Sequence, residues 1–155
     1  MRELAYLVLI LMLTSSCGFK IVSQSDFKNF YIAKIETTGD RKVNFHLKNK
    51  LIFQNKSLDR EKINLNIITK KNKNIKEKNS KNEITKYLIT ISLIVKIEKE
   101  NRIIKTLNFS EKLDFNVGSQ YSQTINNENQ TIKILTNTLA EKVIKEMSKI
   151  TLNDL

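Results

Sequence analysis

The feature that most constrains the fold of this chain is a two-residue alternation between positions 87 and 97. Large apolar side chains occupy every second position, and the residues between them are mostly more polar. The alternating set is Tyr87, Ile89, Ile91, Leu93, Val95 and Ile97. Successive side chains of a β-strand point to opposite faces, whereas a helix repeats every 3.6 residues. The segment is therefore predicted to be a strand, with Ile91 and Leu93 buried between a sheet and its covering helices.

Three further segments have the character of strands. Residues 30–37 are rich in aromatic and β-branched residues, and residues 63–67 alternate Ile or Leu with Asn. Residues 107–117 place apolar side chains on one face, which Glu111 interrupts. A bulge or an exposed edge is predicted at Glu111. Residues 98–101, which lie between the strand segments 87–97 and 107–117, are predicted to form a hairpin turn.

Two segments have the period of helices. Asp40 can cap a helix that begins at Arg41, and its apolar positions then recur every four residues at Val43, Leu47 and Leu51. His46 lies beside this stripe and is interpreted as a packed or half-exposed helix residue. A second stripe is predicted to cover the sheet, with Leu139 and Val143 facing its core. Its members are Ile132, Leu135, Leu139, Val143, Met147 and Ile150.

The order of these elements predicts an α+β fold with the sequence β-α-β-β-β-α. A mainly antiparallel four-stranded sheet is expected to be covered by two helices in a two-layer sandwich. Of the 155 residues, 40% are apolar and 28% are charged, which is typical of a folded globular chain. Residues 29–152 are predicted to form a single domain.

The first 16 residues are predicted to be a signal peptide. Leu4 to Leu13 carry no charge, but a membrane-spanning helix needs roughly 20 such residues. Small residues then precede Cys17, the only cysteine of the chain. This pattern resembles a bacterial lipoprotein signal, which is cut just before a cysteine whose thiol carries a lipid. The alternative is an ordinary signal peptide or short anchor that ends near a free cysteine.

If Cys17 is lipidated, residues 17–28 form a lipidated tether ahead of the domain. Two or three acyl chains would hold the protein stably on a membrane, whereas a single chain binds only marginally. Gly18 follows the cysteine, where Asp would favour retention in the inner membrane of many Gram-negative bacteria. The sequence therefore favours the outer membrane.

The composition argues against several kinds of catalytic and metal site. One cysteine cannot form an internal disulfide, and one histidine cannot form a two-histidine metal motif. We find no nucleophile–base pair, phosphate-binding loop or paired-carboxylate motif, although the 16 carboxylates leave room for a pair that only the fold would reveal. The chain is predicted not to be an enzyme and to need no cofactor besides the covalent lipid on Cys17.

The segment from Lys70 to Lys81 contains six Lys and one Glu, with Ile75 as its only large apolar residue. It is predicted to be a long mobile loop over residues 70–82, because it can bury little apolar surface. One interpretation is a solvated insertion, since Asn, Ile and Lys dominate the whole chain. The same bias makes the net charge of +11 weaker evidence for a polyanionic partner. The other interpretation is a contact for phosphates or acidic sugars. The candidate ligand-binding residues are Lys70, Lys71, Lys73, Lys76 and Lys78.

Several short motifs together resemble one known family. Cys17 is followed by Gly18, Phe19 and Lys20, and the first predicted helix has Arg41 followed by Leu47, Asn49 and Leu51. The C-terminal part has Ser119, Tyr121, Leu139, Ala140 and Ile144. These residues, with the order of the elements, resemble the lipopolysaccharide-assembly lipoprotein family LptE.

The resemblance implies a non-enzymatic, palmitate-bearing lipoprotein on the periplasmic side of the outer membrane. The expected partners are an LptD-like β-barrel translocon, which it would plug and help to assemble, and lipopolysaccharide. The main alternative is a pilot or scaffold lipoprotein of another envelope machine that does not bind lipopolysaccharide. A nucleic-acid partner would suit the positive charge but not the export signal, so no nucleic acid is expected.

The strand directions predict where the basic segment lies. If the second, third and fourth strands are successive hairpin partners, then the second and fourth end on the same side of the sheet. Residues 70–81 and 118–123 should therefore be neighbours. The first strand should begin at the opposite end, about 40 Å away for a third strand of 13 residues.

Overall fold

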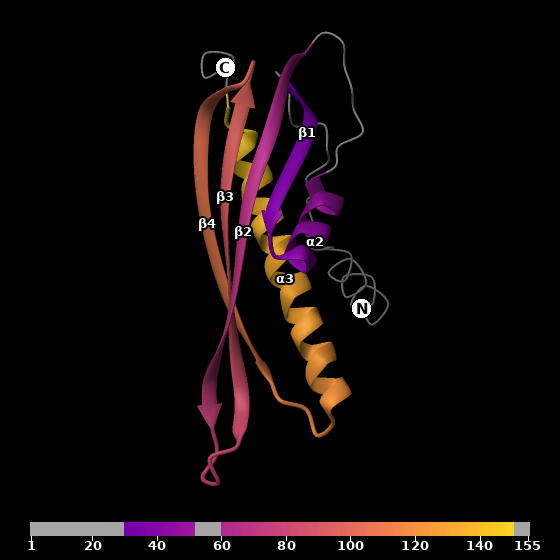
Figure 1. Cartoon of the computed structure of the whole chain (residues 1–155), viewed down its shortest axis with the longest axis vertical. Helices are drawn as coiled ribbons and strands as arrows, with labels where there is room; N and C mark the ends of the chain where they lie inside the picture. The colour runs from indigo at the N-terminus through magenta and orange to yellow at the C-terminus, as the bar shows by residue number, and fades with distance from the viewer. Residues whose placement is uncertain (1–29, 52–59, 151–155) are drawn as a thin grey trace, which may run out of the picture.

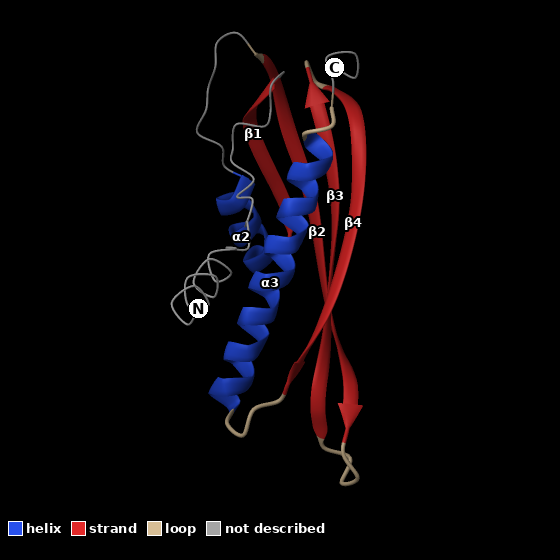
Figure 2. Cartoon of the chain, turned by 180° about the vertical axis from the view of Figure 1, so that it is seen from behind, coloured by secondary structure: helices blue, strands red, loops and turns tan. Residues whose placement is uncertain are grey.

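The computed structural model describes residues 30–51 and 60–150, which form one sheet with two helices on one of its faces (Figures 1 and 2). The predicted α+β class and element order are confirmed. The elements are β1 (Phe30–Gly39), α2 (Arg41–Leu51), β2 (Glu61–Lys78), β3 (Ile84–Lys99), β4 (Arg102–Asn116) and α3 (Tyr121–Met147).

The sheet is mixed and has the strand order β1-β2-β3-β4. β1 pairs in parallel with β2, as expected for two strands joined through α2, and this pairing ends where Gly39 lies opposite Thr69. β2, β3 and β4 are antiparallel neighbours. The turn between β3 and β4 has positive φ at Glu100 and Asn101, the geometry of a tight two-residue hairpin. The turn lies within the predicted range 98–101.

The core lies between the sheet and the two helices. Ile91 and Leu93 of β3 and Leu139 and Val143 of α3 are all buried in one cluster, as predicted. His46 is half-buried beside the α2 stripe. Burial of each large aliphatic side chain stabilises the fold by about 1.5–3 kcal/mol.

The prediction of a mobile loop over residues 70–82 is wrong. β2 continues to Lys78, and its distal residues pair with β3 down to Ile84. Only a short turn remains, stabilised by hydrogen bonds from Asn79 N–H to Glu83 O and from Asn82 N–H to Asn79 O. The composition of the segment is unfavourable in isolation, but the apolar neighbouring strand supplies both a backbone ladder and cross-strand contacts.

Glu111 does not cause a bulge. The β3–β4 pairing is continuous through Ile91 and Glu111, and the irregularity lies instead between Ile97 and Glu98. Glu111 is on the helix-bearing face at the edge strand of the sheet, where its carboxylate pairs with Lys142 of α3. The other prediction for Glu111, a position at the edge of the sheet, is confirmed.

The two ends of the domain are arranged as the strand directions predicted. Figure 1 shows the β2–β3 turn and the start of α3 at one end, with the start of β1 towards the other. The 18 residues of β2 span roughly 55 Å, more than the expected 40 Å, because β2 and β3 extend further than predicted. The signal peptide, the tether and Cys17 lie outside the described residues.

Candidate functional site

We define the distal hairpin as residues 70–87, the part of β2 and β3, with their turn, that continues beyond the end of β1. β1 stops because Gly39 has φ +103° and approaches Thr69 closely; a Cβ at Gly39 would lie 1.9 Å from Thr69 O. The chain then turns into α2. Distal to this point no strand of the described residues pairs with the outer edge of β2, and α2 no longer covers it (Figure 1).

Lys71 is held at the junction between the distal hairpin and α2. Its Nζ lies 3.1 Å from Asp40 Oδ2, and both side chains are mostly buried. Asp40 Oδ1 accepts hydrogen bonds from the N–H groups of Lys42 and Val43, each 3.0 Å long, and so caps α2 as predicted. Partial burial alone would raise the pKa of Asp40. The Val43 N–H, the Lys71 ammonium and the Lys42 N–H outweigh burial and hold that pKa below its usual value.

Lys73 lies on the same face of the sheet as Lys71, and its ammonium group contacts both a carboxylate and an aromatic ring. Its Nζ is 2.5 Å from Glu128 Oε2 on α3 and 4.3 Å from the ring centroid of Tyr87. Tyr87 stacks on Phe115, with ring centroids 5.6 Å apart. A cation over an aromatic face next to a carboxylate is well stabilised, yet the Lys73 side chain remains partly exposed.

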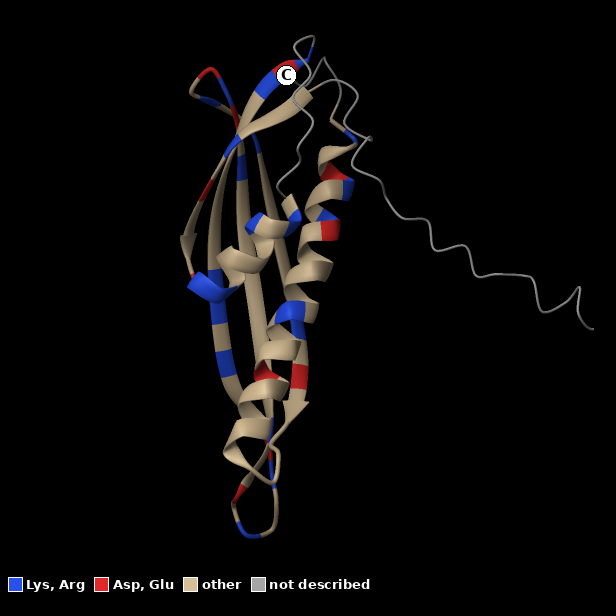
Figure 3. Ribbon diagram, turned by 90° about the vertical axis from the view of Figure 1, so that its right-hand side faces the viewer, with Lys and Arg blue, Asp and Glu red and all other residues tan. Residues whose placement is uncertain are grey.

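The other three candidate lysines are placed differently. Lys76 Nζ lies 3.1 Å from Asp114 on the face without helices, and this contact holds the pKa of Asp114 below its usual value. Lys78 Nζ donates to Asn82 Oδ1 at 2.8 Å within the turn. Lys70, opposite Ser92, has no ion-pair partner among the described residues. The contacts of these lysines therefore lie on both faces of the sheet. Figure 3 shows basic residues along the strands of the distal hairpin.

An exposed apolar group near these lysines was not predicted as part of the site. Ile75 is 52% exposed in the distal hairpin, and Tyr121 is 81% exposed at the start of α3. Val117 is 36% exposed, and its N–H donates to Thr85 O, so the start of the α3 segment is tied to the hairpin. The sequence signal for Ile75 was its place in the two-residue alternation of β2. Ile75 continues the positions that face the helices, after Lys71 and Lys73.

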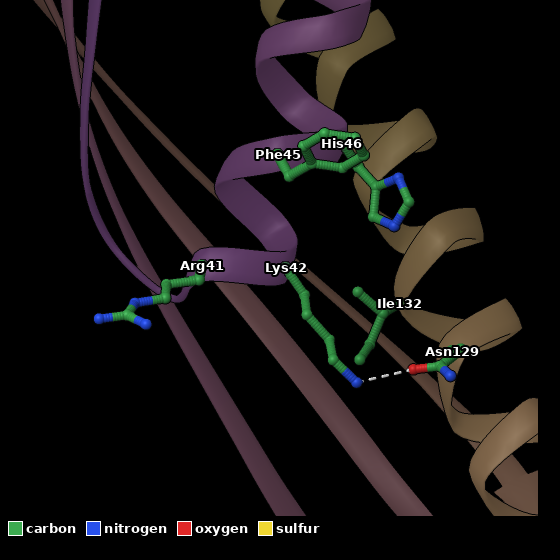
Figure 4. A pocket seen from close by; sticks show the side chains of 6 residues that line it. All are labelled: Arg41, Lys42, Phe45, His46, Asn129 and Ile132. Atoms are coloured by element: carbon green, nitrogen blue, oxygen red, sulfur yellow. Dashed lines mark hydrogen bonds between the residues drawn. The ribbon is translucent and has the colours of Figure 1, made fainter.

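A second candidate is a pocket of about 460 Å³ between α2 and α3. Its lining residues are Arg41, Lys42, Phe45, His46, Asn129 and Ile132. Lys42 Nζ donates to Asn129 Oδ1 at 2.9 Å, whereas Arg41 points away from Ile132 and Asn129 (Figure 4). Since the basic groups do not converge on one point, the pocket lacks the geometry of a specific anion or catalytic site.

The described residues contain neither a metal-ligand cluster nor a membrane-spanning helix. In residues 30–51 and 60–150, no three side chains of His, Cys, Asp and Glu come together in a way that could hold a metal ion. None of the helices in those ranges is long and apolar enough to cross a membrane.

The sequence matches no known family model and no curated protein. Many solved structures are similar in fold, including three bacterial lipoproteins. The rare lipoprotein B of Shewanella oneidensis has a TM-score of 0.57 and 9% identity, over 74% of this chain and 93% of that one. A minor lipoprotein of Acinetobacter baumannii has a TM-score of 0.56 and 14% identity, over 76% and 89%. Lipoprotein B of Nitrosomonas europaea has a TM-score of 0.53 and 14% identity, over 84% and 90%. The chain thus has the fold of these bacterial lipoproteins.

Proposed function

We propose that this chain is a lipid-anchored outer-membrane factor that plugs a lipopolysaccharide translocon barrel, aids barrel assembly and binds lipopolysaccharide. The observation that carries the proposal is the shared fold with rare lipoprotein B, together with a lipoprotein-type signal ending at Cys17. The motif resemblance to the LptE family points to the same role.

The distal hairpin is the proposed lipid-binding end. Lipopolysaccharide carries phosphates and acyl chains, so a site for it needs cations beside apolar surface. Lys73, Lys76 and Lys78 supply ammonium groups there, with Lys76 on the face without helices, and Ile75 and Tyr121 supply exposed apolar surface. Lys70, which has no ion-pair partner among the described residues, adds a cation on the same face as Lys76. Lys71 keeps its contact with Asp40, because that contact joins β2 to α2.

The proposal requires carboxylates to give way to phosphates. Lys73 and Lys76 now face Glu128 and Asp114, and both ion pairs are partly open to solvent. Exposed ion pairs are worth only about 0–1 kcal/mol, so a phosphate with more acceptor oxygens can replace Asp114, whose side chain is 34% exposed. Glu128 is only 15% exposed, so its exchange for a phosphate costs more.

The elongated shape supports a role across a membrane. The start of β1, which among the described residues is nearest in sequence to the predicted anchor, lies at the end opposite the distal hairpin (Figure 1). The roughly 55 Å length of β2 exceeds the roughly 40–45 Å of a bilayer with its headgroups. A protein anchored at one leaflet could thus present the hairpin near the other.

The alternative function is that of a pilot or scaffold lipoprotein for another envelope machine. The observation that favours it is the pairing of Lys71, Lys73 and Lys76 with carboxylates of the same chain, which leaves few free cations. Under this alternative the distal hairpin is a structural extension and binds no lipid.

Depletion of the protein in its native cell separates the two functions. The proposal predicts loss of lipopolysaccharide from the cell surface, its accumulation inside the envelope, and co-purification of the tagged protein with the translocon barrel. The scaffold alternative predicts normal surface lipopolysaccharide and co-purification with a different machine, and that result would overturn the proposal.

A further inference from the structure

The outer edge of β4 is the longest free strand edge in residues 30–51 and 60–150. β4 comes last in the strand order, and Figures 1 and 2 show it at the margin of the sheet with α3 lying inward of it. Every second residue of such a strand directs its N–H and C=O outward, so the edge can pair with another strand.

The outer edge of β4 and the free edge of distal β2 differ in their protection. Lysine side chains commonly guard exposed edges against pairing, and the free edge of distal β2 has five of them between Lys70 and Lys78. The middle of β4, Thr106 to Ser110, has no charged residue. Its ladder with β3 is regular from Lys105 to Asn116. This part of β4 is therefore regularly paired with β3 and carries no charge that would guard its outer edge.

We propose that β4 pairs antiparallel with β4 of a second copy of this chain, around a two-fold axis at Asn108. In this register the segment Lys105–Glu111 is complementary to itself. Lys105 of each copy lies opposite Glu111 of the other, and Leu107 lies opposite Phe109. Thr106 lies opposite Ser110, and Asn108 faces its own copy.

The faces of β4 agree with this register. Leu107 and Phe109 are only partly buried on the helix-bearing side, so each would cover the other's exposed surface across the axis. Thr106, Asn108 and Ser110 are on the opposite, polar face, where their β3 partners are Lys96, Ile94 and Ser92. The result is one sheet that continues through both copies. The dimer goes beyond the proposed function, because it requires neither lipid nor barrel.

Charge exchange on β4 tests the pairing. In sedimentation of the full chain in mild detergent, the wild type is expected to form a dimer. Lys105→Glu places two like-charged pairs across the axis and should raise the dimer dissociation constant about tenfold or more. The double variant Lys105→Glu with Glu111→Lys restores opposite charges and should recover dimerisation. A loss caused only by broken contacts with α3 would not recover, since the double variant also loses the Glu111–Lys142 pair.

Lys112→Glu is the matched control. It changes the net charge equally and lies on the same strand, but in the proposed register it faces the apolar Ile104 and should change the dissociation constant little. Equal weakening by Lys105→Glu and Lys112→Glu would show a general charge effect and overturn the register. A wild-type chain that remains monomeric at about 100 μM would overturn the dimer itself, since that corresponds to less than roughly 5.5 kcal/mol of association.

Cysteine cross-linking gives a second measurement that does not depend on affinity. In a Cys17→Ala background, Asn108→Cys should form a disulfide dimer on mild oxidation, because directly opposed Cβ atoms are about 4.5–5.5 Å apart. Thr106→Cys alone should react poorly, but it should cross-link when mixed with Ser110→Cys. Asn72→Cys on β2 is the control position. Equal reaction at positions 72 and 108 would contradict the two-fold axis.

Discussion

Lys71 Nζ lies 3.1 Å from Asp40 Oδ2 and thereby ties the distal part of β2 to the N-terminus of α2. The same carboxylate caps α2 through its other oxygen. The contact lies beside the point where β1 ends and the distal hairpin begins. It therefore holds the candidate lipid-binding hairpin to the folded core.

Replacement of Asp40 should destabilise the domain. Asp40→Ala removes the cap and the ion pair, and it should lower the free energy of unfolding by about 1–2 kcal/mol. Asp40→Asn retains a capping oxygen and should cost less. Urea unfolding followed by circular dichroism measures both. An Asn variant as unstable as the Ala variant would show that charge, rather than capping, dominates at this position.

The stability contributed by Asp40 should depend on pH in a defined direction. Partial burial alone would raise the pKa of Asp40 in the folded protein. The Val43 N–H, the Lys71 ammonium and the Lys42 N–H have the opposite effect, and the pKa is lowered overall. The unfolded chain therefore takes up the proton first, so this contribution is complete above the unfolded pKa of about 3.9. It should fade as the pH falls below about 3.9 and through the folded pKa. Urea titrations from pH 6 to pH 3 should show a smaller decline for Asp40→Asn than for the wild type.

Leu93 and Ile94 provide a matched pair for the core. Leu93 is 1% exposed and Ile94 is 39% exposed, although the two are neighbours in β3. Leu93→Ala should lower the free energy of unfolding by about 2–5 kcal/mol, whereas Ile94→Ala should cost much less. Thermal melts compare the two variants. Similar melting temperatures for both variants would show that the buried face of β3 is assigned incorrectly.

Lipid attachment should depend on Cys17 alone. Mass spectrometry of the native protein should show a chain that begins at Cys17 with covalently bound acyl groups, and Cys17→Ala should carry none. The variant should keep its fold, because the described core begins at Phe30. An unmodified Cys17 in the native protein would remove the basis for a lipid anchor.

Burial periodicity made much of the fold predictable from the sequence. Ile91 and Leu93 of β3, like Leu139 and Val143 of α3, follow patterns set by one-sided burial, and those patterns depend only on local order. Asp40 was recognised as a cap because capping is also local. The parallel pairing of β1 and β2 followed from their connection through a helix.

The distal hairpin was mispredicted because its stability is not local. Residues 70–78 contain little apolar surface, and their strand forms through pairing with the strongly patterned β3. The stack of Tyr87 on Phe115 depends on the register of β4, which shifts by one residue at the irregularity near Ile97. A one-residue shift exchanges the two faces of a strand, and the sequence does not mark where the shift occurs. Similarly, nothing local to Lys73 identifies Glu128, 55 residues away, as its partner.

Lipopolysaccharide binding by the full-length chain in mild detergent tests the central claim most directly. One variant replaces four lysines of the distal hairpin by Gln and leaves Lys71 in place; these are Lys70, Lys73, Lys76 and Lys78. The control removes the same charge elsewhere, with Gln at Lys48, Lys50, Lys62 and Lys133. We predict that the hairpin variant binds about tenfold more weakly or worse and loses most of its salt dependence, while the control retains most of its affinity. Equal binding by the two variants, whether both strong or both weak, would contradict a lipid site on the distal hairpin.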